Sequence, residues 1–540
     1  MAFFGKNKEQ TTSTERFCVL ACLFVFCVSA IVAIGFVPMN MDEAGIFHSL
    51  ACLDHPFAKY NLFRETCYVK NDLTLAGGFT LFRPQFYTGL FHSVLYAPFF
   101  KLFHAQAGQY LFGLVFLVAF ASLMARQTKQ PRLAFALTLA FFPFTFQFIH
   151  DTGPVKFVML LFPLAALMLR RLLDQTHPAR WAYALLLPVA LFLATEEKAF
   201  FLYLLPSLFF FALTIASEGK TLKELVNQIK ASRWLIGAAG LLFAMLAGWL
   251  LLATNSGGVP YIIWLTKLVG QPQPLSETFI NHLIYLFWWP AYAHNYFEQD
   301  AATLAALLQG YATLGLMIAL GVWGYQNKAR VDLSRLQVSL LALSLCSTAL
   351  VFFLFGNAWA GHHFITLWAP LFFIALRVVT NMPLRLQMAV TLVFLMLNLA
   401  SILTLSQQKF LLKVDPEKEA ILAYLDDTRR AEKSIYNFTT WGAYYIQALY
   451  GPKNQMAVYT EPYEPHPSAA LYPEAASQIL RLAAATNRKI YTICSGKELC
   501  SQQAIEQAFG GKLAFKETLT GLEHWHLFEA DPIDSATAAP

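Results

Sequence analysis

Charged side chains are scarce in this sequence. Asp, Glu, Lys and Arg make up 13% of the 540 residues, whereas soluble domains carry about a quarter. Apolar residues make up 57% and are clustered, and many runs approach the ~20 residues that an α-helix needs to cross a bilayer. The scarcity of charge therefore argues against an ordinary soluble protein and predicts an α-helical polytopic membrane protein.

Other patterns are missing as well. No basic stretch is long or interleaved with base-stacking aromatic residues, so we interpret the net charge of +6 as loop bias and expect no nucleic-acid partner. No Cys-x-x-Cys spacing occurs, which argues against zinc; a carboxylate pair could bind a divalent ion, but no cofactor is indicated. The first apolar run lacks a small-residue cleavage pattern and is too long for a removed signal peptide, so it is interpreted as a transmembrane helix.

The apolar runs predict about eleven transmembrane helices. They lie near 17–37, 109–125, 133–149, 155–169, 181–195, 199–216, 234–254, 301–324, 336–355, 363–381 and 386–405. Segments 86–103 and 276–297 are also apolar and aromatic. Counting the first of them as a span would invert every later loop, so we expect both to be helices lying in the outer interface.

Basic residues gather at alternate ends of these runs. They precede the first span and follow the second, fourth, sixth, eighth and tenth. All of them fall on one side if the N-terminus is cytoplasmic, as the positive-inside rule requires. The sequence thus predicts a bacterial inner-membrane protein whose first external loop, 38–108, and whole C-terminal tail face the periplasm.

The composition changes after about residue 408, where charges and Pro return. We expect helices over 416–429, 440–450, 472–486 and 498–509, and strands over 434–438, 455–459, 489–494, 513–518 and 524–530. Alternating strands and helices predict an external α/β domain over 408–540, following a transmembrane domain over 1–407. No phosphate-cradling glycine fingerprint opens any of its helices.

Four of the eight cysteines fall outside the predicted spans. Cys52 and Cys67 lie in the first external loop, and Cys494 and Cys500 lie in the external domain. On the expected topology all four face an oxidising compartment, so we predict that they pair off as disulfides.

Asp42 and Glu43 are the first candidates for chemistry. They follow the first apolar run directly and open the first external loop. One interpretation is a helix N-cap with an acidic first turn. The other is catalytic: a carboxylate at a membrane mouth can take the proton of an acceptor hydroxyl near a lipid-borne substrate.

Two cations are predicted on the same face. Arg83, in Arg83-Pro84-Gln85, could fork onto a phosphate or anchor an interfacial helix at headgroup level. Lys198 ends Thr195-Glu196-Glu197-Lys198, which interrupts an otherwise apolar run. Charges at membrane depth are usually functional, although a tight turn whose charges reach water is the alternative.

Two further short outer loops carry polar side chains. Asp151 lies in His150-Asp151, before Thr152-Gly153-Pro154, where a plain turn is the local interpretation. His362, in His362-His363, begins the tenth span. Adjacent histidines on a helix point in different directions, so a hydrogen bond to phosphate or sugar, or an interfacial anchor, is favoured over a metal pair.

These motifs together resemble those of the GT-C membrane glycosyltransferases, such as the protein O-mannosyltransferases and the lipid A aminoarabinose transferases. Met41-Asp42-Glu43-Ala44 is similar to their Asp-Glu motif after the first span, and Arg83-Pro84-Gln85-Phe86-Tyr87 to a basic, Pro-rich stretch of the same loop. His150-Asp151 is similar in place to a second acidic motif. The sequence departs from that pattern at Gly45, Ile46, Gln85 and His150.

The resemblance implies a direct, inverting transfer of a sugar from a polyprenyl-phosphate donor to a lipid, glycan or protein acceptor. It implies Asp42 as general base with Glu43 and Asp151 in support, and Arg83, Lys198 and His362 at the donor phosphate. Two alternatives stay open: a membrane transporter, and a polymerase or ligase of lipid-linked glycans.

Overall fold

The computed structural model describes most of the helices and the sheet of the C-terminal part. The described residues are 13–35, 73–74, 80–81, 91–103, 105–149, 155–197, 201–253, 255–256, 259–260, 304–331, 333–354, 365–407, 416–425, 434–438, 456–459, 479–481, 483–484, 487–495 and 500–531. The chain divides into two compact units. One comprises 1–37, 109–253 and 260–410, and the other comprises 38–108, 254–259 and 411–540.

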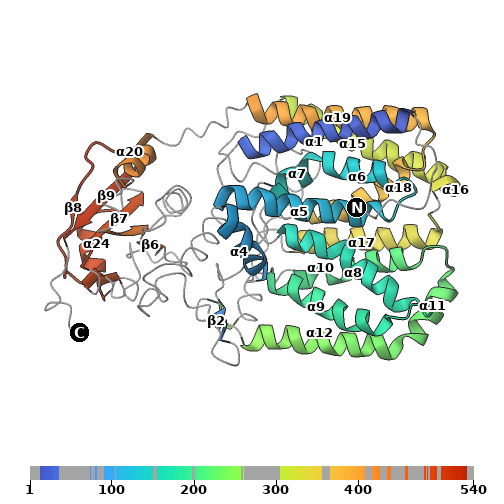
Figure 1. The fold of residues 1–540 in the computed structure, drawn as a ribbon, viewed down its shortest axis with the longest axis horizontal. Coiled ribbons are helices and arrows are strands. Elements are labelled where there is room, and N and C mark those ends of the chain that lie inside the picture. The colour runs from blue at the N-terminus through green and yellow to red at the C-terminus, as the bar shows by residue number, and fades with distance from the viewer. Residues whose placement is uncertain are drawn as a thin grey trace. The chain divides into compact units, whose positions relative to one another are not determined.

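Long apolar helices build the first unit (Figure 1). They are α1 (Ser13–Gly35), α5 (Ala105–Ala125), α6 (Pro131–Ala140), α7 (Phe142–Ile149), α8 (Val155–Leu173), α9 (Arg180–Glu197), α10 (Phe201–Ala216), α12 (Arg233–Ala253), α15 (Leu304–Gln326), α17 (Arg335–Leu354), α18 (Ile365–Val379) and α19 (Leu384–Gln407). Two short helices, α11 (Leu222–Ala231) and α16 (Lys328–Val331), lie at one end of the unit. The end that carries α11 and α16 is called the basic end below.

Each predicted transmembrane segment coincides with one of these helices, except that 133–149 is a pair. Helices α6 and α7 are bent by 67° at Phe141, so the helix in the span predicted over 133–149 is interrupted. Among the described residues, four helices are long and apolar enough to cross a membrane by length and composition, and the bent pair makes five. Helices α10, α17 and α18 are also apolar but shorter. Together these helices indicate an integral membrane protein.

Polar side chains join the helices at two levels. Between α10 and α17, the hydroxyl of Ser207 bonds those of Ser344 and Thr348 within the buried interface. At the basic end, Glu218 accepts from Arg170 of α8 at 2.8 Å and from Arg377 of α18 at 2.6 Å. Hydrogen bonds between helices supplement van der Waals packing where lipid provides no hydrophobic drive, so these contacts help fix α8, α10, α17 and α18.

The second unit contains the helix α4 (Phe91–Phe103), which covers most of the expected interfacial helix 86–103. The other expected interfacial helix, 276–297, lies outside the described residues. Two short antiparallel pairs are also present: β1 (Leu73–Thr74) with β2 (Thr80–Leu81), and β3 (Asn255–Ser256) with β4 (Val259–Pro260).

A five-stranded mixed sheet forms the C-terminal part of this unit, in the order β6-β5-β7-β9-β8. The strands are β5 (Ser434–Phe438), β6 (Met456–Tyr459), β7 (Lys489–Ser495), β8 (Lys516–Glu517) and β9 (Trp525–Ala530). β5 runs parallel to β6 and β7, whereas β9 runs antiparallel to β7 and β8. Helices α20 (Pro416–Leu425) and α24 (Gln502–Ala508) accompany the sheet.

The sequence predictions agree with this topology in its central strands. The strand predicted over 434–438 has the bounds of β5, and those over 455–459, 489–494 and 524–530 differ by one residue at an end. β8 is only two residues long, so the strand predicted over 513–518 is shorter than expected. The helix predicted over 440–450 lies outside the described residues. Within the helix predicted over 472–486, the structure describes helical residues at 479–481 and 483–484.

One hydrophobic cluster joins α20 to the sheet. Tyr436 of β5, Tyr491 of β7 and Leu527 of β9 are almost wholly buried and pack with Ile421 and Leu425 of α20. Each contributing strand is one of the central strands β5, β7 and β9. The α/β part therefore has its own core.

Candidate functional site

The predicted catalytic and phosphate-binding residues lie outside the described residues. This holds for Asp42, Glu43, Arg83, Asp151, Lys198 and His362, and for the expected cysteine pair Cys52 and Cys67. In the first unit, the described helix ends that flank Asp151, Lys198 and His362 in the sequence are Ile149 of α7, Val155 of α8, Glu197 of α9, Phe201 of α10 and Ile365 of α18. They lie at the opposite end of these helices from the basic end, and we call this the acidic end because α9 ends there in two glutamates.

The last two residues of helix α9 are buried glutamates. Glu196 is 9% exposed, and Thr195 and Glu197 are fully buried. The hydroxyl of Thr195 donates to the carbonyl of Leu191 at 2.9 Å. The alternative of a tight turn whose charges reach water does not hold for these two glutamates. Buried carboxylates in a membrane protein are costly and mark functional positions.

Lys156 is a buried cation at the same end, one residue into α8, and the sequence analysis overlooked it. Its side chain is 1% exposed, and its Nζ donates to the carbonyl of Phe148 in α7 at 3.4 Å. The same ammonium group lies 5.3 Å from the centroid of the Phe112 ring of α5. In the sequence, a single lysine at the start of an apolar run could have indicated that Lys156 is a candidate functional residue.

Helices α5 and α7 approach each other closely beside Lys156. A Cβ atom on Gly113 would lie 1.9 Å from the carbonyl oxygen of Phe148, so only glycine fits at this position. Phe148 is thus contacted from α5 and α8 at once. These contacts fix the end of α7, and the chain continues from there into His150 and Asp151.

Pro143 favours the bend between α6 and α7, and contacts with other side chains complete it. Pro143 has no N–H and its ring clashes with the carbonyl four residues earlier, which is that of Leu139. That carbonyl instead accepts from the Thr145 hydroxyl at 2.6 Å. The backbone amide of Phe142 donates to Oδ1 of Asn398 in α19 at 2.6 Å. Two of the backbone groups freed by the bend therefore have side-chain partners.

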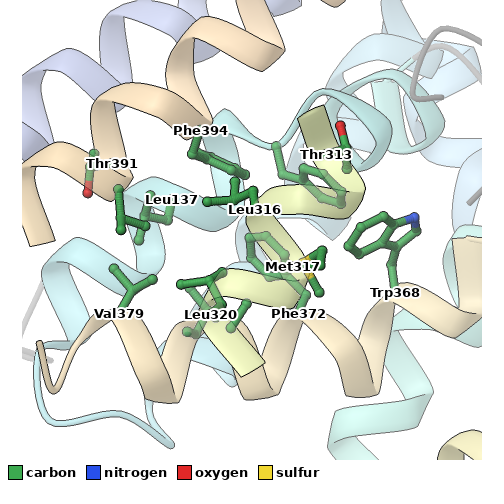
Figure 2. A pocket seen from close by; sticks show the side chains of 14 residues that line it. Leu137, Thr313, Leu316, Met317, Leu320, Trp368, Phe372, Val379, Thr391 and Phe394 are labelled. Carbon is green, nitrogen blue, oxygen red and sulfur yellow. The ribbon is translucent and has the colours of Figure 1, made fainter. Parts of the chain in front are cut away.

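An apolar cavity of about 40 Å³ borders the bend, among α6, α15, α18 and α19. Figure 2 shows the side chains of Leu137, Met317, Trp368, Phe372 and Phe394 converging on it. Rings of Phe141 and Phe372 stack with centroids 4.8 Å apart on its wall. A cavity so small and apolar suits close packing rather than a sugar or a phosphate.

No candidate metal site lies among the described residues. Within these ranges, no group of three or more His, Cys, Asp or Glu side chains is placed to hold a metal ion. Asp42 and Glu43 lie outside these ranges.

Covalent and polar contacts stabilise the C-terminal part. A disulfide joins Cys494, in β7, to Cys500, just before α24, with Cα atoms 5.8 Å apart. The carboxylate of Glu417 in α20 accepts from the backbone amides of Glu523, His524 and Trp525. Three amide donors hold the segment leading into β9 against α20.

Comparisons with known proteins bear on the fold. No protein-family model and no curated protein matches the chain. Two crystal structures of ArnT from Cupriavidus metallidurans do, one in the apo state and one bound to undecaprenyl phosphate. Each shares 11% sequence identity and a TM-score of 0.54, over 98% of this chain and 100% of the other. The chain therefore has the fold of ArnT, the lipid A aminoarabinose transferase, a GT-C enzyme.

Proposed function

We propose that this protein is a membrane glycosyltransferase that moves a sugar from a polyprenyl-phosphate donor to an acceptor on the outer face. The observation that carries the proposal is the ArnT fold over nearly the whole chain. One of the matching ArnT structures is bound to undecaprenyl phosphate, which supports a donor of that class. The acceptor is a lipid, a glycan or a protein.

The residues proposed for the chemistry are the six that the resemblance to GT-C enzymes implies. Asp42 acts as the general base for the acceptor hydroxyl, and Glu43 and Asp151 support it. Arg83, Lys198 and His362 bind the donor phosphate and stabilise the charge that develops on it as the sugar departs. The buried Glu196 and Glu197 directly precede Lys198, and Lys156 lies five residues after Asp151.

The test is sugar transfer by purified protein in detergent or nanodiscs with a polyprenyl-phosphate sugar. Asp42→Asn should abolish transfer while the protein still folds and binds polyprenyl phosphate. Asp174→Asn, in the loop between α8 and α9, serves as the matched control and should keep full activity. An Asp42→Asn protein with normal transfer would remove Asp42 from the mechanism.

One observation favours the transporter alternative, namely the bent helix pair α6–α7. Transporters often use broken helices whose ends bind ions or substrates. Here, however, Asn398 and Thr145 bond two of the backbone groups that the bend frees, and the neighbouring cavity is apolar. Uptake of a solute into proteoliposomes without sugar transfer would support transport instead.

A further inference from the structure

A large apolar cavity lies among α8, α9, α10 and α12. Its volume is about 270 Å³, and every residue that lines it is apolar. Each of the four helices contributes lining residues, for example Leu169 of α8, Pro188 of α9, Leu208 of α10 and Gly240 of α12. Apolar cavities stay dry, and helices of this kind are surrounded by hydrocarbon, so the suitable occupant is a hydrocarbon chain.

The cavity is accessible from the surface of the helical unit. Phe209, which lines it from α10, is 50% exposed, and Phe243 on α12 is partly exposed. Met245, two positions further along α12, is 63% exposed. Apolar residues exposed in this way contact lipid tails in a membrane protein. A tail can therefore enter from the bilayer without the helices separating.

The basic end of the same helices carries interfacial side chains. Trp181 and Trp234, in the first turns of α9 and α12, are 72% and 79% exposed. Trp is enriched where a bilayer meets water. Ile236, which lines the cavity, follows Trp234 by two positions, or about 3 Å along the helix axis. The cavity thus begins just inside the hydrocarbon boundary.

Exposed cations lie at that boundary. Arg233 is exposed, and its guanidinium lies 5.4 Å from the centroid of the Trp234 ring. Lys223 and Lys230 of α11 are exposed as well, against the single acidic residue of that helix, Glu224. The resulting positive charge favours a negatively charged headgroup over a neutral one.

Polar contacts hold α11 and the start of α12 in place. The hydroxyl of Ser232, between the two helices, accepts from Arg180 at 2.8 Å and from Gln175 at 2.8 Å. Thr221 and Glu224 form a capping box at the start of α11. On the outer side of α11, Leu222 is 60% and Val226 is 38% exposed. The exposed cations are therefore presented by an anchored helix and not by a free loop.

We propose that this region binds one anionic glycerophospholipid of the bilayer. An acyl chain fills the cavity among α8, α9, α10 and α12, and Arg233 and Lys230 bind the phosphate headgroup. The proposed headgroup cations lie at the basic end, and Glu197 lies at the opposite end of α9. None of these residues is assigned to the proposed transfer, so we expect lipid binding here to be independent of it.

Native mass spectrometry of the full-length protein tests this proposal, with phosphatidylglycerol and phosphatidylcholine as probes. We expect one phosphatidylglycerol to be retained, with about thirtyfold higher affinity than phosphatidylcholine, because each of the two basic side chains contributes about 1 kcal/mol toward an anionic headgroup. Arg233→Gln with Lys230→Gln should reduce that preference to near unity. The pair Arg335→Gln with Arg385→Gln, exposed cations elsewhere at the basic end, should leave it unchanged.

A second pair of variants tests the cavity itself. Gly240→Leu places a side chain in the cavity, and Gly237→Leu places the same side chain on an exposed part of α12 outside it. A Cβ at either glycine has no heavy atom within 4 Å, so both backbones accept the change. Only Gly240→Leu should lower retention of both lipids. Equal retention by the two variants, or a site that takes polyprenyl phosphate in preference to phosphatidylglycerol, would overturn the proposal.

Discussion

Asn398 of α19 accepts a hydrogen bond from the backbone amide of Phe142 at 2.6 Å, across 256 positions of the sequence. That amide opens α7 immediately after the 67° bend. Both residues are buried, so water is not an alternative partner. The bend in the α6–α7 pair therefore depends on a side chain from the last helix of the unit.

Replacing Asn398 should destabilise the helical unit. Asn398→Leu leaves a buried amide without an acceptor, which costs about 1–3 kcal/mol. We expect a lower midpoint of thermal unfolding in detergent. Asn398→Asp keeps an oxygen at that position and should recover part of the loss. If Asn398→Leu matched the native stability, the bond would have no role in holding the bend.

The position of the bend illustrates what the sequence could predict and what it could not. Apolar runs located the helices because length and hydropathy are local properties. Pro143 was visible, yet Pro163, Pro188, Pro206 and Pro370 lie inside helices that continue past them. Whether a proline ends a helix thus depends on partners elsewhere, such as Asn398, which a local pattern does not reveal.

The candidate site shows the same division. The sequence identified Glu196 and Glu197 as unusual because charge interrupts an apolar run, and both are buried. It predicted the cysteine pair of the C-terminal part from topology, and Cys494 is bonded to Cys500. Lys156 was missed because a charge next to a helix end looks like a loop residue until α5 and α7 are seen to cover it. Asp42, Glu43, Arg83, Asp151, Lys198 and His362 remain predictions.

Gly113 should tolerate no side chain. Gly113→Ala would place a methyl group 1.9 Å from the backbone oxygen of Phe148, and a backbone atom cannot rotate away. We expect α5 and α7 to separate, with a lower folded yield and a lower unfolding midpoint. Gly315→Ala in α15, where the added Cβ meets nothing within 4 Å, is the matched control and should behave like the native protein.

Lys156 should matter for both packing and transfer. Lys156→Met removes the donor to Phe148 and the cation beside Phe112 while keeping the length of the side chain. Because α7 leads into His150 and Asp151, we expect at least about a tenfold loss of transfer, the size expected when a supporting contact near a site is lost. Lys156→Arg keeps the charge and should retain more activity than Lys156→Met.

The matched control for Lys156 is Lys129→Met, the same exchange at an exposed position between α5 and α6. It should leave transfer and stability at native levels. Activity and unfolding are measured on the same preparations, so that a folding defect is separated from a site defect. Native transfer by Lys156→Met would show that the cation has no part in positioning the loop.

Glu417 should make the C-terminal part sensitive to acid. The amide of Glu523, together with those of His524 and Trp525, lowers the pKa of this carboxyl below its ordinary value of 4.5. A depressed pKa in the folded state means that the stabilisation is fully present above about pH 4.5 and is lost as the pH falls through the folded-state pKa. Protonation weakens the acceptor, so the segment leading into β9 should detach from α20 in that range.

Hydrogen exchange of the amides of 523–525, in the full-length protein between neutral pH and the acid range, measures this effect once intrinsic exchange is corrected for. In the native protein, protection should fall as the pH drops below about 4.5. Glu417→Gln keeps one acceptor oxygen but does not titrate, so its protection should be lower at neutral pH and should not change through that window. Glu506→Gln, which removes another carboxylate whose pKa is lowered, is the control and should keep the native pH dependence at 523–525. A native-like profile in Glu417→Gln would mean that a different group controls the acid response, because the three amides then gain nothing from the charge on Glu417.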